Sequence, residues 1–189
     1  MKLPPTDSTK YPNILTEAII NSPLGSMHVI ADEKGLYLLQ FVDIQGLDKE
    51  IEHLKRKTKS EIIPGKTRPI ISIEHELLAY FDGKLKEFKT TLFPIGSFFQ
   101  KLVWNEILNI PYGKTRSYQE ESVAIGQPSA YRAVANANGA NKIAIIIPCH
   151  RIIKNNGEIG GYRGGIARKK WLIEHERKNH QGIVTIKSH

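Results

Sequence analysis

The first half of the chain combines short strand-like apolar runs with helical spacing, whereas the second half shows mainly helical spacing, and this difference constrains the fold more than any other feature of the sequence. Three short apolar runs, 15–21, 27–32 and 36–42, have the composition of strands and are separated by turn sequences. Two stretches with helical spacing follow, 46–57 and 70–82. The first half is therefore expected to be an α/β unit in which a meander of strands forms an antiparallel sheet.

The second predicted helix leads into the predicted boundary between two domains. Its inward face is expected to carry Ile73, Leu77, Leu78 and Phe81. Gly83 ends the helix, and residues 84–97 have the composition of a loop. We place the boundary in this loop, so that residues 1–92 form the α/β domain and residues 93–189 form a second domain.

The second half shows the spacing of several helices. The first is expected over residues 97–109. Ser117 and Glu120 then have the spacing of a capping box at the start of a short helix, and Pro128 is expected to be the first residue of the next one. Two short helices joined by a glycine-containing turn predict a helix-turn-helix unit. The second domain is therefore expected to be mainly helical.

Composition excludes several classes of protein. The single cysteine among 189 residues excludes an intramolecular disulfide and a cysteine-based zinc cluster. The seven histidines show no HxxxH or HExxH spacing, so no metal site is predicted. No apolar run is long enough to span a bilayer, and the first thirteen residues lack the apolar segment of a secretory signal. We therefore expect no membrane association and a location in the cytoplasm.

The positive charge is confined to one half of the chain. Residues 1–100 contain thirteen basic and thirteen acidic side chains, whereas residues 101–189 contain fourteen basic and six acidic ones, which accounts for the net charge of +8. A one-sided basic field attracts polyanions such as nucleic acids. From charge alone, binding of nucleic acid and a basic surface that serves solubility are equally good interpretations.

The densest group of chemically reactive residues surrounds the only cysteine. Residues 143–147 are predicted to form a buried strand that stops at Pro148, directly before Cys149. A lone cysteine is more often part of an inert core, but positive charge on His150 and Arg151 would lower the pKa of the thiol. Neighbours on an extended strand point to opposite faces, so a water is expected to connect Cys149 and His150.

A histidine that accepts a proton needs a partner that fixes its tautomer. Glu176 is the candidate, because it falls on the inward face of a helix expected over residues 166–176. A surface position near the helix end is an equally good interpretation of Glu176 from the sequence alone.

These residues resemble the active-site signature of the O6-methylguanine–DNA methyltransferase family. The signature in this chain is Ile147-Pro148-Cys149-His150-Arg151-Ile152-Ile153. Further matches at the family's spacing are Phe99 to Trp104, Ile110-Pro111-Tyr112-Gly113, Ser117-Tyr118, Arg132-Ala133-Val134, Asn138 to Asn141, Gly157, Gly160 to Gly165, Lys169, Trp171-Leu172 and Glu176. The resemblance is strong over residues 97–176 and looser over residues 13–96. It implies an RNase H-like α/β domain followed by a helical domain of the winged helix-turn-helix type.

The resemblance implies a single-turnover DNA repair enzyme. Cys149 would accept a methyl or other alkyl group from the O6 of guanine in a stoichiometric, irreversible transfer that needs no cofactor. His150 would take the thiol proton through a water, and Glu176 would orient His150. Asn141 would hold the cysteine loop, and Tyr118 would donate a hydrogen bond to guanine N3 and stabilise the departing base.

The resemblance also implies how damaged DNA would bind. The modified guanine would be rotated out of a double-stranded DNA whose minor groove is occupied by a protein helix, and Arg132 would fill the gap in the stack. The residues expected at the DNA are Arg132, Ala133, Tyr118, Ser117 and Arg151. The residues expected around the base are Ile159, Gly160, Gly161, Tyr162, Arg163 and Gly164. The protein would act as a monomer, and it would lie at the nucleoid or, in a eukaryote, in the nucleus.

Two positions depart from the family's pattern. Tyr131 is bulkier than the residue expected before Arg132, and Arg163 replaces a small residue of some relatives, which puts the minor-groove fit and the preferred alkyl size in doubt. The resemblance also leaves open activity on O4-alkylthymine and cooperative binding to DNA. Two other classes remain as alternatives: a DNA-binding regulator without catalysis, and a cysteine hydrolase that turns over repeatedly.

Overall fold

A computed structural model describes residues 14–180, and the predicted meander forms the centre of its first half. The strands are β1 (Ile14–Ile20), β2 (Met27–Ala31), β3 (Leu36–Phe41) and β4 (Glu61–Pro64). They lie in the order β3-β2-β1-β4, and the first three pair antiparallel as predicted. The missed strand β4 pairs parallel with β1, so the sheet is mixed rather than purely antiparallel. The first thirteen residues, on which the expected lack of a secretory signal rests, lie outside the described part.

Two helices accompany the sheet, α1 (Leu47–Thr58) and α2 (Arg68–Phe81), and α2 packs against β2. The buried face of α2 carries Ile70, Ile73, Leu77 and Tyr80, which recur at the spacing of helical turns. Leu78 was predicted on this face, but its side chain is 66% exposed. It follows Leu77 directly, and adjacent helical residues point about 100° apart, so only one of the two can lie on the centre of the face.

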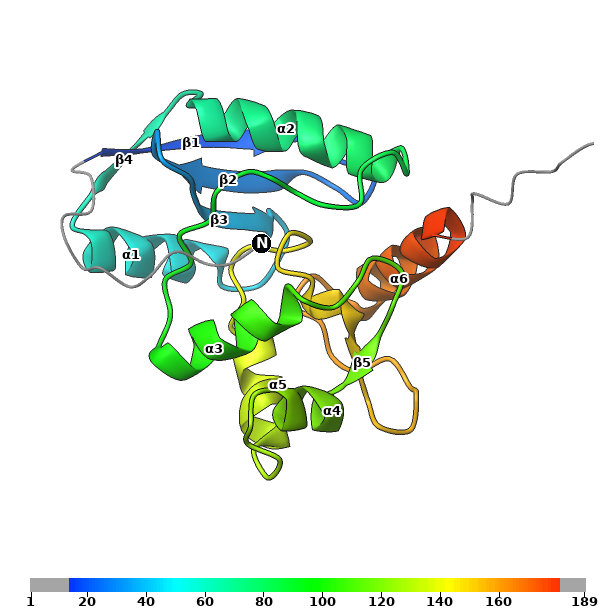
Figure 1. Cartoon of the computed structure of the whole chain (residues 1–189). Helices are drawn as coiled ribbons and strands as arrows, with labels where there is room; N and C mark the ends of the chain where they lie inside the picture. The colour runs from blue at the N-terminus through cyan, green and yellow to red at the C-terminus, as the bar shows by residue number, and fades with distance from the viewer. Residues whose placement is uncertain (1–13, 181–189) are drawn as a thin grey trace, which may run out of the picture.

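The second half is mainly helical, as Figure 1 shows below the sheet. Its elements are α3 (Phe98–Ile107), β5 (Arg116–Ser117), α4 (Tyr118–Ala124), α5 (Tyr131–Gly139), the 3-10 helix η1 (Cys149–Arg151), β6 (Ile152–Ile153) and α6 (Ile166–His180). The capping box at Ser117 and Glu120 is confirmed, and it fixes the start of α4. The prediction for Pro128 was wrong, because α5 begins three residues later, at Tyr131, after a turn.

The predicted strand over residues 143–147 was also wrong, although the segment is buried. Ile145 has a φ of 71°, which no regular strand allows, and the chain turns there. Only Ile143 makes a strand-like bridge, to Leu39 of β3. Ala144 N donates to Leu39 O at 2.8 Å, and Leu39 N donates to Lys142 O at 2.9 Å. These bonds fasten the second half to the edge of the sheet.

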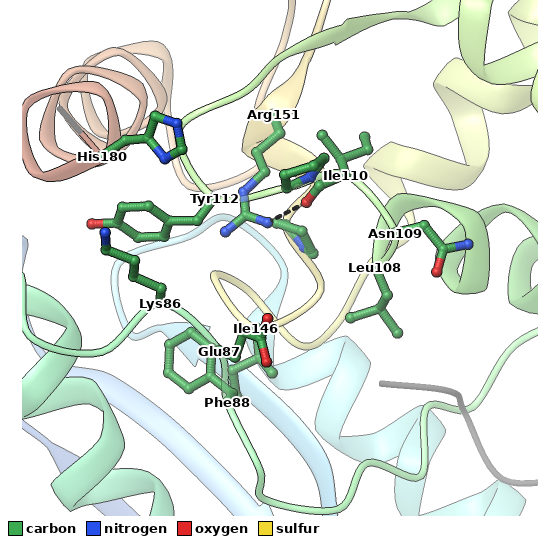
Figure 2. A pocket seen from close by; sticks show the side chains of 12 residues that line it. Lys86, Glu87, Phe88, Leu108, Asn109, Ile110, Tyr112, Ile146, Arg151 and His180 are labelled. Atoms are coloured by element: carbon green, nitrogen blue, oxygen red, sulfur yellow. Dashed lines mark hydrogen bonds between the residues drawn. The ribbon is translucent and has the colours of Figure 1, made fainter.

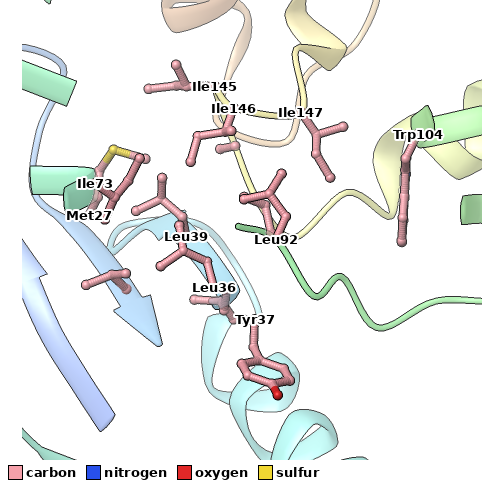
Figure 3. Close-up of a cluster of buried hydrophobic side chains, with 14 of the residues drawn as sticks. Met27, Leu36, Tyr37, Leu39, Ile73, Leu92, Trp104, Ile145, Ile146 and Ile147 are labelled. Carbon is pink, nitrogen blue, oxygen red and sulfur yellow. The ribbon is translucent and has the colours of Figure 1, made fainter. Parts of the chain in front are cut away.

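One hydrophobic core runs through both halves of the described chain. In Figure 3, Leu36 and Leu39 of the sheet face Leu92 and Ile146 of the later segments. Trp104 of α3 extends this core, and its indole N–H donates to the carbonyl of Ala137 in α5 at 2.8 Å. The segment that carries the cysteine is therefore held between the sheet and the helices. No helix within residues 14–180 is long and apolar enough to cross a membrane.

Candidate active site around Cys149

Cys149 begins the 3-10 helix η1, and Pro148 separates it from the buried turn at residues 143–147. Its side chain is 8% exposed. The amide of Asn141 donates from Nδ2 to the sulfur at 3.1 Å and to the carbonyl of Ile147 at 2.9 Å. Because the backbone coils here, the alternation of a strand does not apply to Cys149 and His150. The structure thus brings Asn141 to the cysteine loop, where the resemblance placed it.

His150 and Glu176 meet in the interior. His150 Nε2 lies 2.8 Å from Glu176 Oε1, and the side chains are 0% and 1% exposed. The inward position of Glu176 is therefore correct, and its interpretation as a surface residue is not. His150 Nδ1 is buried and has no hydrogen-bond partner among residues 14–180. Since Glu176 occupies Nε2, Nδ1 is the nitrogen left to accept a proton.

Glu176 also accepts hydrogen bonds from Arg151, Tyr80 and Gly113. Arg151 donates from Nε to Oε2 at 2.9 Å and from Nη2 to Oε1 at 3.0 Å. The Tyr80 hydroxyl donates to Oε1 at 2.8 Å, and the backbone N–H of Gly113 donates to Oε2 at 3.1 Å. Tyr80 was missed, although its position three residues after Leu77 on the inward face of α2 was a signal available in the sequence.

Arg151 does not lie where the resemblance placed it. It was expected at the DNA, but its side chain is 8% exposed and is held by Glu176 and by the carbonyl of Ile110, which accepts from Nη1 at 2.6 Å. Figure 2 shows this guanidinium at the edge of a cavity of about 480 Å³ that Tyr112 and His180 also line. Cys149 does not line this cavity, so it is not the space for the substrate.

The thiol is not activated in the way the sequence suggested. Burial raises the pKa of Cys149, although the hydrogen bond from Asn141 and the charge of Lys169 act against it. The expected lowering by His150 and Arg151 fails for two reasons. Burial lowers the pKa of His150 and keeps it neutral despite Glu176, and the charge of Arg151 is balanced by Glu176.

The carboxyl of Glu176 stays ionised. Burial alone would raise the pKa of this carboxyl, but the hydrogen bonds from His150 and Arg151 and the charge of Arg151 outweigh it and hold the pKa well below the usual value. The resting site therefore contains a neutral thiol, a neutral imidazole and a buried ion pair between Glu176 and Arg151.

A second cavity, of about 460 Å³, opens onto the sulfur. Its walls come from α4, α5, η1 and the loop before α6. They consist of Tyr118, Ala135, Asn136, Asn138, Gly139, Cys149, Gly161, Tyr162 and Arg163. Its size fits a purine base with a small substituent. Of the residues expected around the base, Gly161, Tyr162 and Arg163 line this cavity, whereas Ile159, Gly160 and Gly164 do not.

Close packing explains two of these glycines. A Cβ at Gly160 would lie 2.9 Å from the hydroxyl of Tyr118, and a Cβ at Gly164 would lie 2.7 Å from the ring of Tyr162. Both rings line the cavity, so larger residues behind them would push them into it. Lys169, 0% exposed, supports the same loop by donating to the carbonyl of Gly161 at 3.0 Å, and burial lowers the pKa of Lys169 to about 8.

Arg163 separates this cavity from a third one, of about 620 Å³. The third cavity lies between α1 and α3 and is also lined by Arg163. The guanidinium is anchored to the first half of the chain by an ion pair with Glu50 at 2.9 Å. Arg163 therefore limits the space beside Cys149. The replacement of a small residue of some relatives by Arg163 thus bears on the size of the alkyl group that the cavity can hold.

Apart from Arg151, the residues expected at the DNA lie in the first turns of α4 and α5 or directly before them. Arg132 and Ala133 are exposed in the first turn of α5. The guanidinium of Arg132 lies 5.6 Å from the ring centre of Tyr131, whose side chain is 40% exposed. Ser117 uses its hydroxyl to cap α4, and Tyr118 reaches the cavity from the first turn of that helix.

Comparison with known proteins matches both halves of the chain to one family. Residues 15–94 match the 6-O-methylguanine DNA methyltransferase, ribonuclease-like domain, and residues 98–178 match the 6-O-methylguanine DNA methyltransferase, DNA binding domain. The chain belongs to this family. The resemblance seen in the sequence is thereby confirmed, together with the predicted fold of an α/β part followed by a helical part.

Individual relatives of this 6-O-methylguanine DNA methyltransferase family support the assignment. A methylated-DNA--protein-cysteine methyltransferase of Methanosarcina barkeri is 43% identical over 170 residues, which cover 85% of this chain and 96% of the relative. The crystal structure of Mycobacterium tuberculosis O6-methylguanine methyltransferase matches with a TM-score of 0.76 and 39% identity, over 87% of this chain and 94% of that one. A structure of the M. tuberculosis protein OGT in complex with DNA matches with a TM-score of 0.75 and 37% identity, over 88% and 94% of the two chains.

Proposed function

We propose that this protein repairs DNA by direct reversal, by moving an alkyl group from the O6 of guanine to the sulfur of Cys149. The observation that carries the proposal is the position of Cys149 in the wall of a base-sized cavity, next to His150, which is paired with Glu176 of α6. Membership in the family supports the same reaction. Because Cys149 is the only cysteine, it is the only thiol that can accept the group.

The thiol gives its proton through a bridging water to Nδ1 of His150, and the new imidazolium is stabilised by the ionised Glu176. The thiolate attacks the alkyl carbon, so that a sulfur–carbon bond forms while the carbon–O6 bond breaks. The electron pair leaves with O6, and the Tyr118 hydroxyl stabilises the purine by donating a hydrogen bond to N3. The thioether is stable, so each chain reacts once.

The same proposal covers the binding of DNA. Guanine inside a duplex cannot reach the sulfur, so the nucleotide is rotated out at a cost of a few kcal/mol. Arg132 and Ala133, exposed at the start of α5, enter the minor groove, and Arg132 replaces the base in the stack. Tyr162 covers the extruded base. One chain acts on one lesion as a monomer, in the compartment that holds the DNA.

We also propose a division of labour along the chain. Residues 93–189 carry the DNA-binding helices and the cysteine, and residues 1–92 support them. Backbone hydrogen bonds join β3 to residues 142–144, shortly before the cysteine turn. They support this division because they hold the cysteine turn in a fixed position relative to the sheet.

Mass spectrometry tests the reaction directly. The protein is incubated with a duplex that contains one O6-methylguanine, then digested. The peptide that contains Cys149 should gain the mass of one methyl group in place of one hydrogen, with one methyl per chain. Cys149→Ser and an unmodified duplex serve as controls. A DNA-binding regulator would bind the duplex without gaining mass, and a cysteine hydrolase would turn over repeatedly on esters or amides.

A further inference from the structure

The hydroxyl of Tyr80 is a contact between the first half of the chain and the reacting groups. Tyr80 lies near the end of α2, yet its hydroxyl donates to Oε1 of Glu176 in α6 at 2.8 Å. The side chain is 0% exposed. We propose that Tyr80 is a positioning residue for alkyl transfer, which holds Glu176 against His150 and limits how strongly that pair retains a proton. This inference rests on the function proposed above.

The hydrogen bonds of Glu176 indicate why an additional donor matters. Arg151 binds both carboxylate oxygens, so on its own it would draw Glu176 into a simple two-pronged ion pair. His150 needs Oε1 of the same carboxylate, at 2.8 Å. Tyr80 donates to Oε1 from a separate element, α2, so the oxygen that faces His150 is fixed by three donors rather than two. The carboxylate is thereby oriented by both halves of the chain.

The ring and the hydroxyl of Tyr80 have separable roles. The ring packs against Phe81, Phe88 and His175, each with its ring centre 5.4 Å from that of Tyr80, and against Tyr112 at 6.0 Å. A phenylalanine at position 80 would keep these contacts and lose only the hydrogen bond to Glu176. Tyr80→Phe therefore tests the hydroxyl without removing the packing.

The charges around the pair give the direction of the effect. Burial raises the pKa of Tyr80 well above its usual value, and the charge of Glu176 raises it further, so the hydroxyl stays a donor at every physiological pH. A hydrogen bond to the carboxylate disperses the negative charge that His150 faces. Without that bond the charge on Oε1 is less screened, and the imidazolium becomes more stable.

The remaining charged and titratable groups would be unchanged by the substitution. Arg151 and Lys169 lower the pKa of His150. The carboxylate of Glu176 lies close enough to Tyr112 to raise the pKa of the Tyr112 hydroxyl. Tyr162 senses the charge of Glu176 more weakly than that of Cys149. Since none of these is altered in Tyr80→Phe, a change in the pH dependence reports on the Tyr80 hydroxyl.

The test is the single-turnover rate of methyl transfer from a duplex with one O6-methylguanine, measured against pH. The rate falls on the acidic side as His150 becomes protonated. In Tyr80→Phe the midpoint of this fall should move up by about one pH unit, the size expected for one hydrogen bond to a charged group. On the acidic flank this lowers the rate about tenfold, since one unit of pKa is a factor of ten.

The matched control is Tyr112→Phe, which removes a hydroxyl from the neighbouring ring without touching the hydrogen bonds of Glu176. Its pH midpoint should equal that of the wild type. If the pH midpoint of Tyr80→Phe equalled that of the wild type, the inference would be overturned. This also holds if the variant is less active, where its midpoint is unchanged and a thermal melt shows a loss of folded protein that accounts for the lower activity. If the wild type itself transferred no methyl group, the proposed function would fail instead, so the two failures are distinguishable.

Discussion

Replacing Arg151 by methionine separates the structural position of this residue from its expected position at the DNA. Methionine keeps most of the length of the side chain and removes the charge and all N–H donors. The substitution breaks both hydrogen bonds to Glu176 and the bond to the carbonyl of Ile110. Glu176 then keeps His150, Tyr80 and the N–H of Gly113, but it loses its only cationic partner within hydrogen-bond distance among residues 14–180.

The expected cost follows from burial. Removing one partner of a buried ion pair typically costs about 3–5 kcal/mol, because the other charge stays buried without compensation. The side chains of Arg151 and Glu176 are 8% and 1% exposed, so solvent screening does not reduce this figure. In a protein of this length each kcal/mol shifts the melting temperature by about 2–4 °C. Arg151→Met should therefore melt roughly 6–20 °C below the wild type.

The assay is differential scanning calorimetry combined with binding to an unmodified duplex, and Arg132→Met is the matched control. Arg132 is exposed at the start of α5, so its substitution should change stability by less than about 0.5 kcal/mol while it impairs transfer from duplex DNA. Transfer from the free base O6-benzylguanine should survive in Arg132→Met. If Arg151→Met melted like the wild type and lost only duplex affinity, the buried ion pair would not contribute as argued and Arg151 would belong at the DNA.

Three further substitutions test the site. His150 and Arg151 hold the pKa of Glu176 below its usual value of 4.5, so this stabilisation exists above that pH and is lost as the pH falls below it. The wild type should therefore lose more stability than Glu176→Gln in urea titrations between about pH 5 and pH 3, and parallel losses would contradict the shift. Arg163→Ala removes a side chain that lines two cavities and should raise the rate with O6-benzylguanine relative to O6-methylguanine. An unchanged ratio of the two rates would contradict this. Gly160→Ala places a Cβ 2.9 Å from the Tyr118 hydroxyl and should slow transfer without a large change in melting temperature; wild-type rates would show that Tyr118 tolerates the shift.

Residues fixed by a short local pattern were predictable from the sequence. Cys149 and His150 follow a proline at the end of an apolar run, and helical spacing offered Glu176 the inward face of α6, although a surface position was an equally good interpretation until the structure showed the side chain buried. The capping box at Ser117 was readable because both partners lie within four residues. In each case the information that determines the geometry is contained in one turn of chain.

Electrostatic properties were not predictable in this way, because they depend on partners distant in sequence. The two basic neighbours of Cys149 suggested an acidic thiol, but Arg151 is balanced by Glu176, twenty-five residues later, and His150 is made neutral by burial. The same sequence pattern would lower the pKa of the thiol in an exposed loop. Whether a neighbouring charge acts on a sulfur is decided by what else that charge contacts.

The run of apolar residues at 143–147 shows that backbone conformation is also hard to predict from a short apolar segment. Its composition is typical of a buried strand, and it is indeed buried, but Ile145 has a positive φ and the chain turns instead of extending. Burial dictates apolar side chains whatever the backbone does, so an apolar run of five residues predicts the environment and not the conformation. The turn helps to position the site, because residues 142–144 are bonded to β3 and the turn connects them to Cys149 within a few residues.

The hydrogen bond between Tyr80 and Glu176 joins residues on opposite sides of any boundary drawn in the 84–97 loop. A division of the chain by composition therefore cuts through the network that orients the proton acceptor. If the 93–189 segment were isolated, Glu176 would lose the Tyr80 donor and the aromatic side chains of α2 that shield it from water. The low exposure of Glu176, the partner of His150, is thus a property of the two halves together.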